Sequence, residues 1–211
     1  MMKTPMQQLF DQIRITLCGG RLAQAQVEGI NAVLGACARH GISDARQRAY
    51  VLATAFHETA GRFQPVRETL AATDAEAINR LEHSYQAGKL PQVRTPYWRP
   101  DEQGRSWFGR GFVQLTHRRN YQALSAALGI DLTVDPGRAL ECDTAADILA
   151  LGMRDGLFSG TRLADVFTAT TCDWLGARRI VNGQDRADLV AGYGKAICGG
   201  VGAAAAIANL R

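Results

Sequence analysis

Apolar residues recur at helical spacing along most of this chain, and that periodicity constrains the fold more than any other feature of the sequence. It predicts helices at residues 6–17, 22–39, 44–58, 71–90 (broken at Gly88), 120–128, 143–153 and 163–174, and a last helix from about residue 187. Glycines stand where several of these helices should end, at Gly19, Gly20, Gly41 and Gly129. We therefore expect a mainly α fold, with helices around a cleft.

The length of 211 residues is enough to bury one core, and the sequence contains no internal repeat. We predict a single domain over residues 1–211, with the helices of residues 1–43 packed on it. The tail at 199–211 is rich in alanine and glycine, and its composition leaves open whether it is ordered or disordered.

Residues 91–108 interrupt the helical pattern with a long segment rich in proline. Long loops within compact domains are often functional. The segment holds Tyr97, Trp98 and Trp107, and aromatic faces stack on the apolar faces of sugar rings, although core packing is the commoner fate of tryptophan. The next stretch, 109–116, fits either a short strand or the start of a helix.

Charge limits the choice of partners. The chain carries 24 Lys and Arg against 20 Asp and Glu, a net charge of +4, which favours an anionic polymer such as a bacterial wall. Arg118-Arg119 and Arg178-Arg179 are interpreted as ordinary solvated charges. Because there is no long basic run and no nucleic-acid motif, we expect no nucleic-acid partner.

Several features indicate the cellular compartment. No stretch approaches the roughly 20 apolar residues that span a bilayer, so we expect no membrane span. Polar residues break any apolar run near the N-terminus, so we expect no signal peptide. The five cysteines are odd in number and form no CxxC pair, which favours free thiols in a bacterial cytoplasm. We expect a monomer.

Two carboxylates, Glu58 and Glu68, lie ten positions apart (68 − 58), with a glycine and a proline between them. Those residues bend the backbone, so the second carboxylate can fold back toward the first. Two carboxylates across a cleft can cleave a glycoside, one as the proton donor and the other to activate water. Phe56 and Phe63 lie near Glu58 in the sequence, and apolar neighbours suit a donor that must stay neutral until it acts.

The same segment begins like the zinc-protease motif HExxH, because His57 precedes Glu58. The fifth position is Gly61 rather than histidine, so that motif fails. The other histidines have no ligand spacing, and no serine or cysteine nucleophile signature is present. The sequence therefore predicts neither a metal nor a cofactor.

Motifs occur in a defined order along the chain: His57-Glu-Thr-Ala-Gly61, Pro65-Val-Arg-Glu68, Trp107-Phe-Gly-Arg-Gly-Phe-Val-Gln-Leu-Thr116, Asn120-Tyr121 and Ile180-Val-Asn-Gly183. Together they resemble the family 19 glycoside hydrolases over residues 25–198, and in particular the compact endolysins of bacteriophages and prophages. The short spacing of the two glutamates is similar to the phage branch, because the plant chitinases space theirs more widely.

The resemblance implies a lysozyme-like helical fold, with a substrate cleft between two lobes, and an inverting mechanism. It implies that Glu58 is the general acid, that Glu68 is the general base and that the Thr116 hydroxyl helps to hold the attacking water. The residues expected to contact substrate are His57, Trp107, Gln114, Asn120, Tyr121 and Asn182.

The resemblance also implies the substrate and the setting. We expect hydrolysis of the β-1,4-linked glycan strands of peptidoglycan by an endolysin made in the host cytoplasm, which acts on the wall after release. Chitin is the competing substrate. A lytic transglycosylase, which needs only one carboxylate, and a wall-binding protein without catalysis are the other hypotheses.

The late motif departs from the family pattern. Asn182 is followed by Gly183-Gln184 where the family has Gly-Gly, and Leu189 stands where an arginine often precedes the late tyrosine, here Tyr193. A salt bridge usually found near the catalytic acid is therefore in question, and Arg186 is a candidate substitute.

Several candidates also have structural interpretations. Glu68 could belong to a surface ion pair with Arg67, Thr116 could cap a helix, Asn120 could serve a turn, and His57 could orient or pack beside Glu58.

Overall fold

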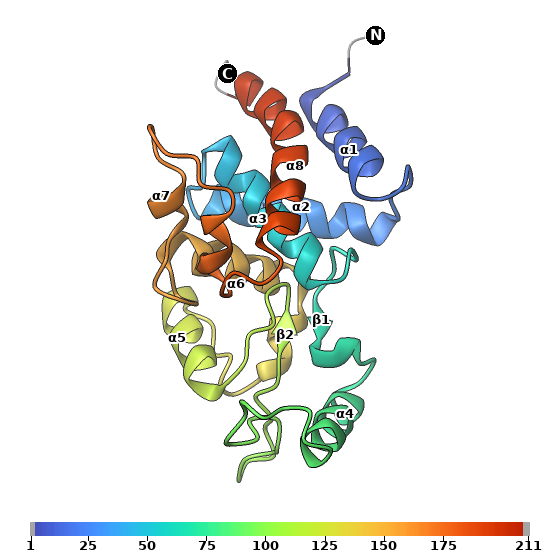
Figure 1. The fold of residues 1–211 in the computed structure, drawn as a ribbon, viewed down its shortest axis with the longest axis vertical. Coiled ribbons are helices and arrows are strands. Elements are labelled where there is room, and N and C mark those ends of the chain that lie inside the picture. The colour runs from blue at the N-terminus through green and yellow to red at the C-terminus, as the bar shows by residue number, and fades with distance from the viewer. Residues whose placement is uncertain (1–2, 209–211) are drawn as a thin grey trace.

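The computed structural model describes residues 3–208 and the side chains of residues 3–200. Its helices are α1 (Pro5–Thr16), α2 (Gln24–Arg39), α3 (Ala45–Glu58), α4 (Asp74–Gln86), α5 (Arg118–Leu128), α6 (Cys142–Asp155), α7 (Leu163–Val166) and α8 (Ala187–Ala208) (Figure 1). The strands are β1 (Val66–Arg67) and β2 (Arg110–Gly111), and the 3-10 turns are η1 (Glu68–Leu70), η2 (Pro136–Leu140) and η3 (Gly176–Ile180). The prediction of a mainly α fold is confirmed.

Local sequence explains where several helices begin and end. Asp44 caps α3, because its side chain accepts hydrogen bonds from the backbone N–H groups of Arg46 and Gln47. Such a cap contributes about 1 kcal/mol, because it satisfies donors that have no partner inside the helix. At the other end, α5 and α6 stop at Gly129 and Gly156, which take the left-handed conformation that glycine adopts without strain.

The larger hydrophobic core lies between α1, α2, α3, α6 and α8. In it, α8 packs against both α1 and α3, and α2 packs against α6 (Figure 1). Two glycines allow α8 to lie this close. A Cβ on Gly194 would lie 2.7 Å from the Trp174 ring, and one on Gly200 would lie 3.0 Å from the Leu9 Cα. Larger residues at either position would separate α8 from its neighbours.

A smaller hydrophobic cluster lies under α4 and the irregular segment that follows it, in the lower part of Figure 1. Its buried members are Ala71, Ala77, Leu81, Trp98 and Phe108. The chain thus has a large helical lobe and a small lobe, each with its own apolar cluster. The antiparallel pair of β1 and β2 lies between them, with Val66 opposite Gly111 and Arg67 opposite Arg110.

The helix predicted at 163–174 is wrong for most of its length. The structure has only the four residues of α7, followed by a turn closed by the bridge between Phe167 and Cys172. The Thr168 hydroxyl oxygen accepts hydrogen bonds from the backbone N–H groups of Thr170 and Thr171. Threonine side chains that bond to nearby backbone in this way compete with helix formation.

The C-terminal tail is described in part. Residues 199–208 continue α8 as helix, whereas residues 209–211, the rest of the tail whose order the sequence left open, lie outside the described residues. Within the described part of the chain, no helix combines the length and apolar character that crossing a membrane requires.

Candidate active site

Glu58 is the last residue of α3, so a rigid helix in the large lobe sets its position. The chain turns sharply after it, because Ala60 and Gly61 both have positive φ, 51° and 80°. Thr59 fixes this turn: it is fully buried, its hydroxyl donates to the Ala55 carbonyl at 2.7 Å, and it accepts from the Phe63 N–H at 3.0 Å. The predicted general acid therefore sits on a well-braced helix end.

The partner of Glu58 is Arg178, from η3. The Arg178 Nη1 lies 2.6 Å from Glu58 Oε1, and its Nε donates to the Asp185 carbonyl at 2.9 Å. The Arg178 side chain is 3% exposed and that of Glu58 is 17% exposed. One guanidinium thus joins the end of α3 to the loop after η3.

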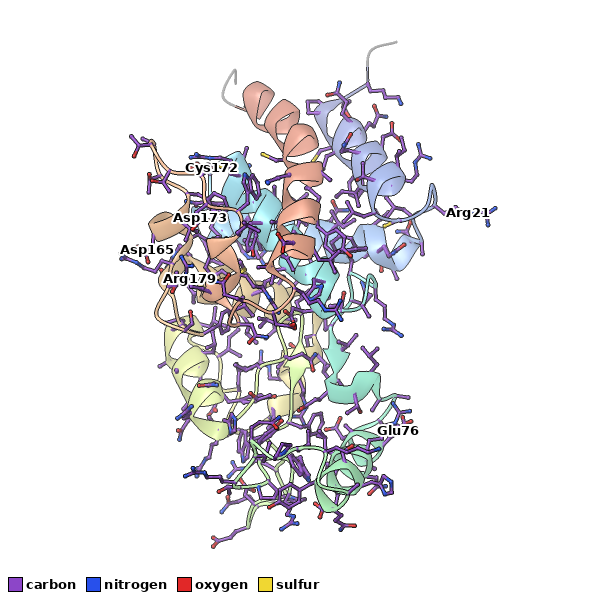
Figure 2. The ribbon with its side chains drawn as sticks, viewed as in Figure 1. Arg21, Glu76, Asp165, Cys172, Asp173 and Arg179 are labelled. Carbon is purple, nitrogen blue, oxygen red and sulfur yellow. The ribbon has the colours of Figure 1, made fainter. Side chains whose placement is uncertain are left out.

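This pair corrects two sequence interpretations. Arg178 is not a solvated charge, although its neighbour Arg179 is, with 52% of its side chain exposed beside Asp173 (Figure 2). The salt bridge that Leu189 put in question is present, and Arg178 makes it rather than Arg186, which is exposed. Sequence could not separate Arg178 from Arg179, because their burial depends on how η3 packs.

Glu68 follows β1 directly, and the strand pair positions it. Its N–H donates to the Gly109 carbonyl at 2.7 Å, and its Oε2 accepts from the Gly109 N–H at 2.7 Å. The Tyr97 hydroxyl donates to Oε1 at 2.8 Å. Both oxygens are therefore held by groups from the segment that leads into β2, and the interpretation of Glu68 as a surface partner of Arg67 is wrong.

Gly109 must be glycine for this contact to form. A Cβ there would lie 2.8 Å from Gln114 Oε1 and 3.3 Å from Glu68 Oε2. The absence of a side chain lets the backbone N–H reach the carboxylate. The same distances place Gln114, a predicted substrate contact, beside Glu68.

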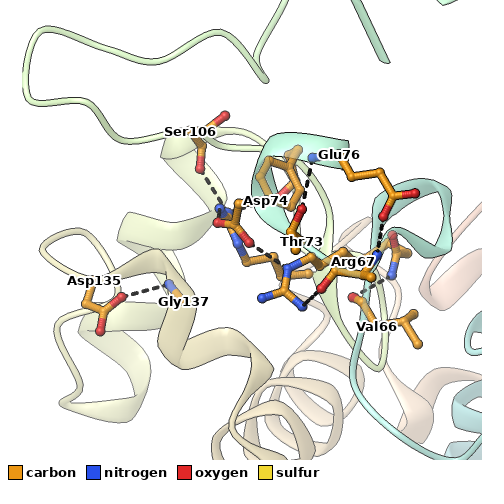
Figure 3. Close-up of polar contacts among 12 residues, drawn as sticks. Val66, Arg67, Thr73, Asp74, Glu76, Ser106, Asp135 and Gly137 are labelled. Carbon is orange, nitrogen blue, oxygen red and sulfur yellow. Dashed lines mark hydrogen bonds and ion pairs between the residues drawn. The ribbon is translucent and has the colours of Figure 1, made fainter. Parts of the chain in front are cut away.

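A partly exposed ionic network, in which only Arg110 is buried, supports the strand pair. Arg67 and Arg110 are directly opposite each other, an arrangement in which like charges destabilise a sheet. Asp74 neutralises both: Oδ1 lies 2.6 Å from Arg67 Nε and Oδ2 lies 2.8 Å from Arg110 Nη2 (Figure 3). Because Glu68 follows Arg67, this bridge fixes the backbone that carries the predicted base.

Thr116, Gln114 and Asn120 lie together. They line a cavity of about 180 Å³ with Phe158 and Val181. Asn120 Nδ2 donates to the Thr116 carbonyl at 2.8 Å, while the Thr116 hydroxyl donates no hydrogen bond within the described residues. Thr116 is not the cap of α5, since His117 occupies that position. Its hydroxyl therefore serves neither as a cap nor as a hydrogen-bond donor within the described residues.

His57 and Asn182 both lie close to the pair of Glu58 and Arg178. His57 is half-buried, and its ring centroid is 6.5 Å from that of Tyr193. Burial, opposed by the charge of Glu58, lowers the pKa of His57 below 6.5, so it is neutral at neutral pH. Asn182 is exposed, and its backbone N–H donates to the Arg178 carbonyl at 3.1 Å. Asn182 and Glu58 are thus both bonded to Arg178.

Trp107 and Tyr121 are corrections to the predicted substrate contacts. Trp107 is 5% exposed and Tyr121 is fully buried, with their rings packed at a centroid distance of 5.3 Å. The Tyr121 hydroxyl donates to the Phe108 carbonyl at 3.0 Å and accepts from Arg110 Nη1 at 3.1 Å. Both side chains therefore support β2 from the core, and little of either is exposed to contact a sugar. Trp98 is likewise a core residue.

Strained backbone gathers in these segments. The non-glycine residues with positive φ include Ala60, Phe63, Thr69, Leu70, Gln114 and His117, all within a few positions of Glu58, Glu68 or Thr116. Such conformations cost about 1–3 kcal/mol each and persist where the surrounding structure enforces them, often at functional sites. The strain therefore marks the same region as the predicted catalytic residues.

Sequence reasoning missed the roles of Tyr97 and Arg178. In the sequence Tyr97 is one aromatic of the irregular segment, and no spacing relates it to Glu68, 29 positions away. The described residues contain no group of three or more His, Cys, Asp or Glu side chains that could hold a metal ion.

Comparisons with known proteins identify the family of the chain. Residues 23–148, more than half of the chain, match the family model of the chitinase class I glycoside hydrolases, family 19. The matched range contains Glu58, Glu68 and Thr116, whereas Arg178 lies beyond it.

Two solved structures share the fold. The crystal structure of a chitinase C mutant has 20% sequence identity and a TM-score of 0.54, over 92% of this chain and 90% of that one. Chitinase C from Streptomyces griseus HUT6037 has 21% identity and a TM-score of 0.53, over 92% of this chain and 75% of that one. At these identities the likeness establishes the lysozyme-like helical fold and nothing about substrate.

Proposed function

Because this chain belongs to the family 19 glycoside hydrolases, we propose that it hydrolyses the β-1,4-linked glycan strands of bacterial peptidoglycan by an inverting mechanism. Members of this family hydrolyse O-glycosyl bonds, so the chain is a glycoside hydrolase. The identity of the glycan and the roles of individual residues are the proposal.

One observation carries the assignment of roles: two carboxylates close in sequence are held by different partners in different lobes. Glu58 is fixed by Arg178 in the large lobe. Glu68 is fixed by Tyr97 and by the Gly109 N–H beside the small lobe. An inverting enzyme needs two carboxyl groups set apart with room for water between them.

In this mechanism Glu58 donates its proton to the glycosidic oxygen as the bond to the anomeric carbon breaks. A water molecule attacks that carbon from the opposite face, and its proton passes to Glu68. The net reaction adds one water across the bond. Negative charge develops on Glu58 as it loses its proton, and Arg178, 2.6 Å away, stabilises that charge.

The cavity beside Glu68 suits the attacking water. Thr116 and Gln114 line it, and Gln114 is the residue in contact range of Gly109, whose N–H binds Glu68. We assign the Thr116 hydroxyl to orienting the water, and Gln114, Asn120, His57 and Asn182 to the sugar.

Peptidoglycan is favoured over chitin by the short glutamate spacing, which is similar to that of phage endolysins, and by the net charge of +4. The five cysteines, which form no disulfide in the described structure, fit synthesis in a reducing cytoplasm and release to the wall afterwards. Chitin is the second candidate, because the matching family model is that of class I chitinases.

The experiment is digestion of purified peptidoglycan, with mass spectrometry of the soluble products. Products with ordinary reducing ends and an initial α-anomer by NMR would support an inverting hydrolase. Anhydro-muramic ends would contradict it in favour of a transglycosylase. Cleavage of chitin alone would make the protein a chitinase, and binding without cleavage of either polymer would refute catalysis.

Substitutions test the two roles. E58Q and E68Q should each lower kcat by about 10²-fold or more, with the fold retained by circular dichroism. Glu102, an exposed glutamate of the irregular segment without an ion pair in the described structure, provides the control, and E102Q should behave as wild type. Full activity of E68Q would contradict the two-carboxylate mechanism.

A further inference from the structure

A second, larger cavity adjoins the proposed base. It has a volume of about 670 Å³ and is lined by Gln92, Val93, Arg94, Thr95, Tyr97, His117 and Arg119. Tyr97 is the link, because its hydroxyl donates to Glu68 Oε1 at 2.8 Å and its ring packs against His117 at a centroid distance of 4.4 Å. Tyr97 therefore contacts Glu68 through its hydroxyl and also lines the cavity.

The charge of the cavity has one sign. Arg94 comes from the irregular segment and Arg119 from α5, and no acidic residue lines the walls. Both arginines are exposed, and neither guanidinium makes an ion pair or a hydrogen bond with any residue of the described part of the chain. Most other arginines of the protein do pair, so these two cations are left available to a ligand.

The start of α5 is a second, independent feature that favours an anionic ligand in this cavity. Arg118 and Arg119 occupy its first turn, which has no acidic residue, and no side chain caps it. Positive charge is unfavourable at a helix N-terminus, where the backbone dipole already presents positive charge. An anion in the cavity would remove that penalty, whereas a neutral ligand would not.

We propose that this cavity is a subsite for the substituent of a muramic acid residue, with Arg94 and Arg119 binding its carboxylate. Every second sugar of peptidoglycan is a muramic acid residue, whose lactyl carboxyl is either free or amide-linked to a peptide that ends in carboxylates of its own, whereas chitin carries no carboxylate. The subsite rests on the proposed function, and it would supply the preference for peptidoglycan over chitin that the catalytic residues themselves do not explain.

The test is binding to an E58Q chain, in which hydrolysis should be slower by about 10²-fold or more and whose substitution lies outside the cavity. The probes, measured by calorimetry, are a tetrasaccharide of two N-acetylglucosamine–N-acetylmuramic acid repeats, its methyl ester, and chitotetraose. Methyl esterification removes the charge and keeps the sugar, so it isolates the carboxylate.

We expect R94Q/R119Q to weaken binding of the free acid about tenfold or more, as for the loss of charge-assisted hydrogen bonds, and to leave the ester and chitotetraose unchanged. Raising the salt concentration should weaken binding of the free acid selectively. The control R21Q/K195Q removes two exposed charges outside the cavity and should change nothing. Arg21 extends away from the molecule after α1 (Figure 2).

Equal binding of acid and ester, or equal weakening of all three ligands in R94Q/R119Q, would overturn the subsite. Digestion of peptidoglycan by the wild-type chain distinguishes failure of the subsite from failure of the proposed function. Cleavage with no effect of R94Q/R119Q refutes only the subsite. Selective binding of the acid without cleavage refutes only the assignment of substrate.

Discussion

Arg178 Nη1 lies 2.6 Å from Glu58 Oε1, and this contact joins residues 120 positions apart in the chain. It places a buried cation against the proposed general acid and ties the end of α3 to the loop after η3. The position of Glu58 and that of the loop after η3 thus both depend on the Arg178 side chain. Arg178 is therefore the most informative position to substitute.

We expect R178A to lower kcat on the order of 10²-fold, because the charge that develops on Glu58 loses its stabilising partner. The free energy of unfolding should also fall, since Glu58 and the Asp185 carbonyl both lose the guanidinium that bonds to them. Steady-state hydrolysis and urea unfolding measure the two effects. The control is R179A, whose ion pair with Asp173 is exposed and should contribute no more than about 1 kcal/mol. Similar losses in both variants would refute a specific role for Arg178.

Tyr97 should act on the proposed base and not on overall binding. Burial and the adjacent Glu68 raise the pKa of the Tyr97 hydroxyl, so it stays protonated and donates. We expect Y97F to lower kcat about tenfold or more, the effect of losing one hydrogen bond to a charged group, with a smaller change in KM. Y85F is the control, because Tyr85 belongs to the same cluster and its hydroxyl makes no hydrogen bond within the described residues. An unchanged kcat in Y97F would show that the contact is incidental.

Gly109 should tolerate no side chain. In G109A the new Cβ would lie 2.8 Å from Gln114 Oε1 and 3.3 Å from Glu68 Oε2, so both side chains must move. We expect a loss of kcat of about tenfold or more, because catalytic groups lose efficiency when displaced even slightly. The comparison is G192A on the exposed face of α8, where a Cβ meets nothing within 4 Å. That change should leave activity intact and stabilise the helix slightly, so full activity of G109A would contradict the tight contact.

Asp74 should make stability depend on pH in the acid range. Burial acts to raise the pKa of Asp74, but hydrogen bonds and charges from Arg67 and Arg110 outweigh it, and the pKa lies below 3.8. Its folded-state pKa is lower than its unfolded value, so the stability it contributes is present above pH 3.8 and is lost as pH falls through the folded pKa.

Urea unfolding of wild type and D74N at several pH values measures this contribution. We expect D74N to be less stable at pH 7, with the difference between the two proteins constant down to the ordinary aspartate pKa and shrinking below it. D155N, which removes a carboxylate paired with one exposed arginine, should change stability much less. A difference between wild type and D74N that does not vary with pH would exclude the ionic bridge as its cause.

Local sequence was sufficient for most of the helices. The apolar periodicity predicted α2, α3, α5 and α8 closely, because this signal acts within the helix that it defines. The same reasoning failed after Val166, where threonine hydroxyls bond to the backbone and form a turn. Apolar periodicity alone does not reveal where side-chain hydrogen bonds to the backbone compete with helix formation.

The sequence by itself determined the helical class, the family and the two glutamates of the candidate site, because these depend on patterns and motifs within short stretches. Only the tertiary structure decided which arginine reaches Glu58, that Tyr97 and Gly109 hold Glu68, and that Trp107 and Tyr121 pack in the core. Those outcomes depend on contacts between segments far apart in the chain. Burial and long-range contact are properties of the packed lobes, and no spacing of residues along the chain encodes them directly.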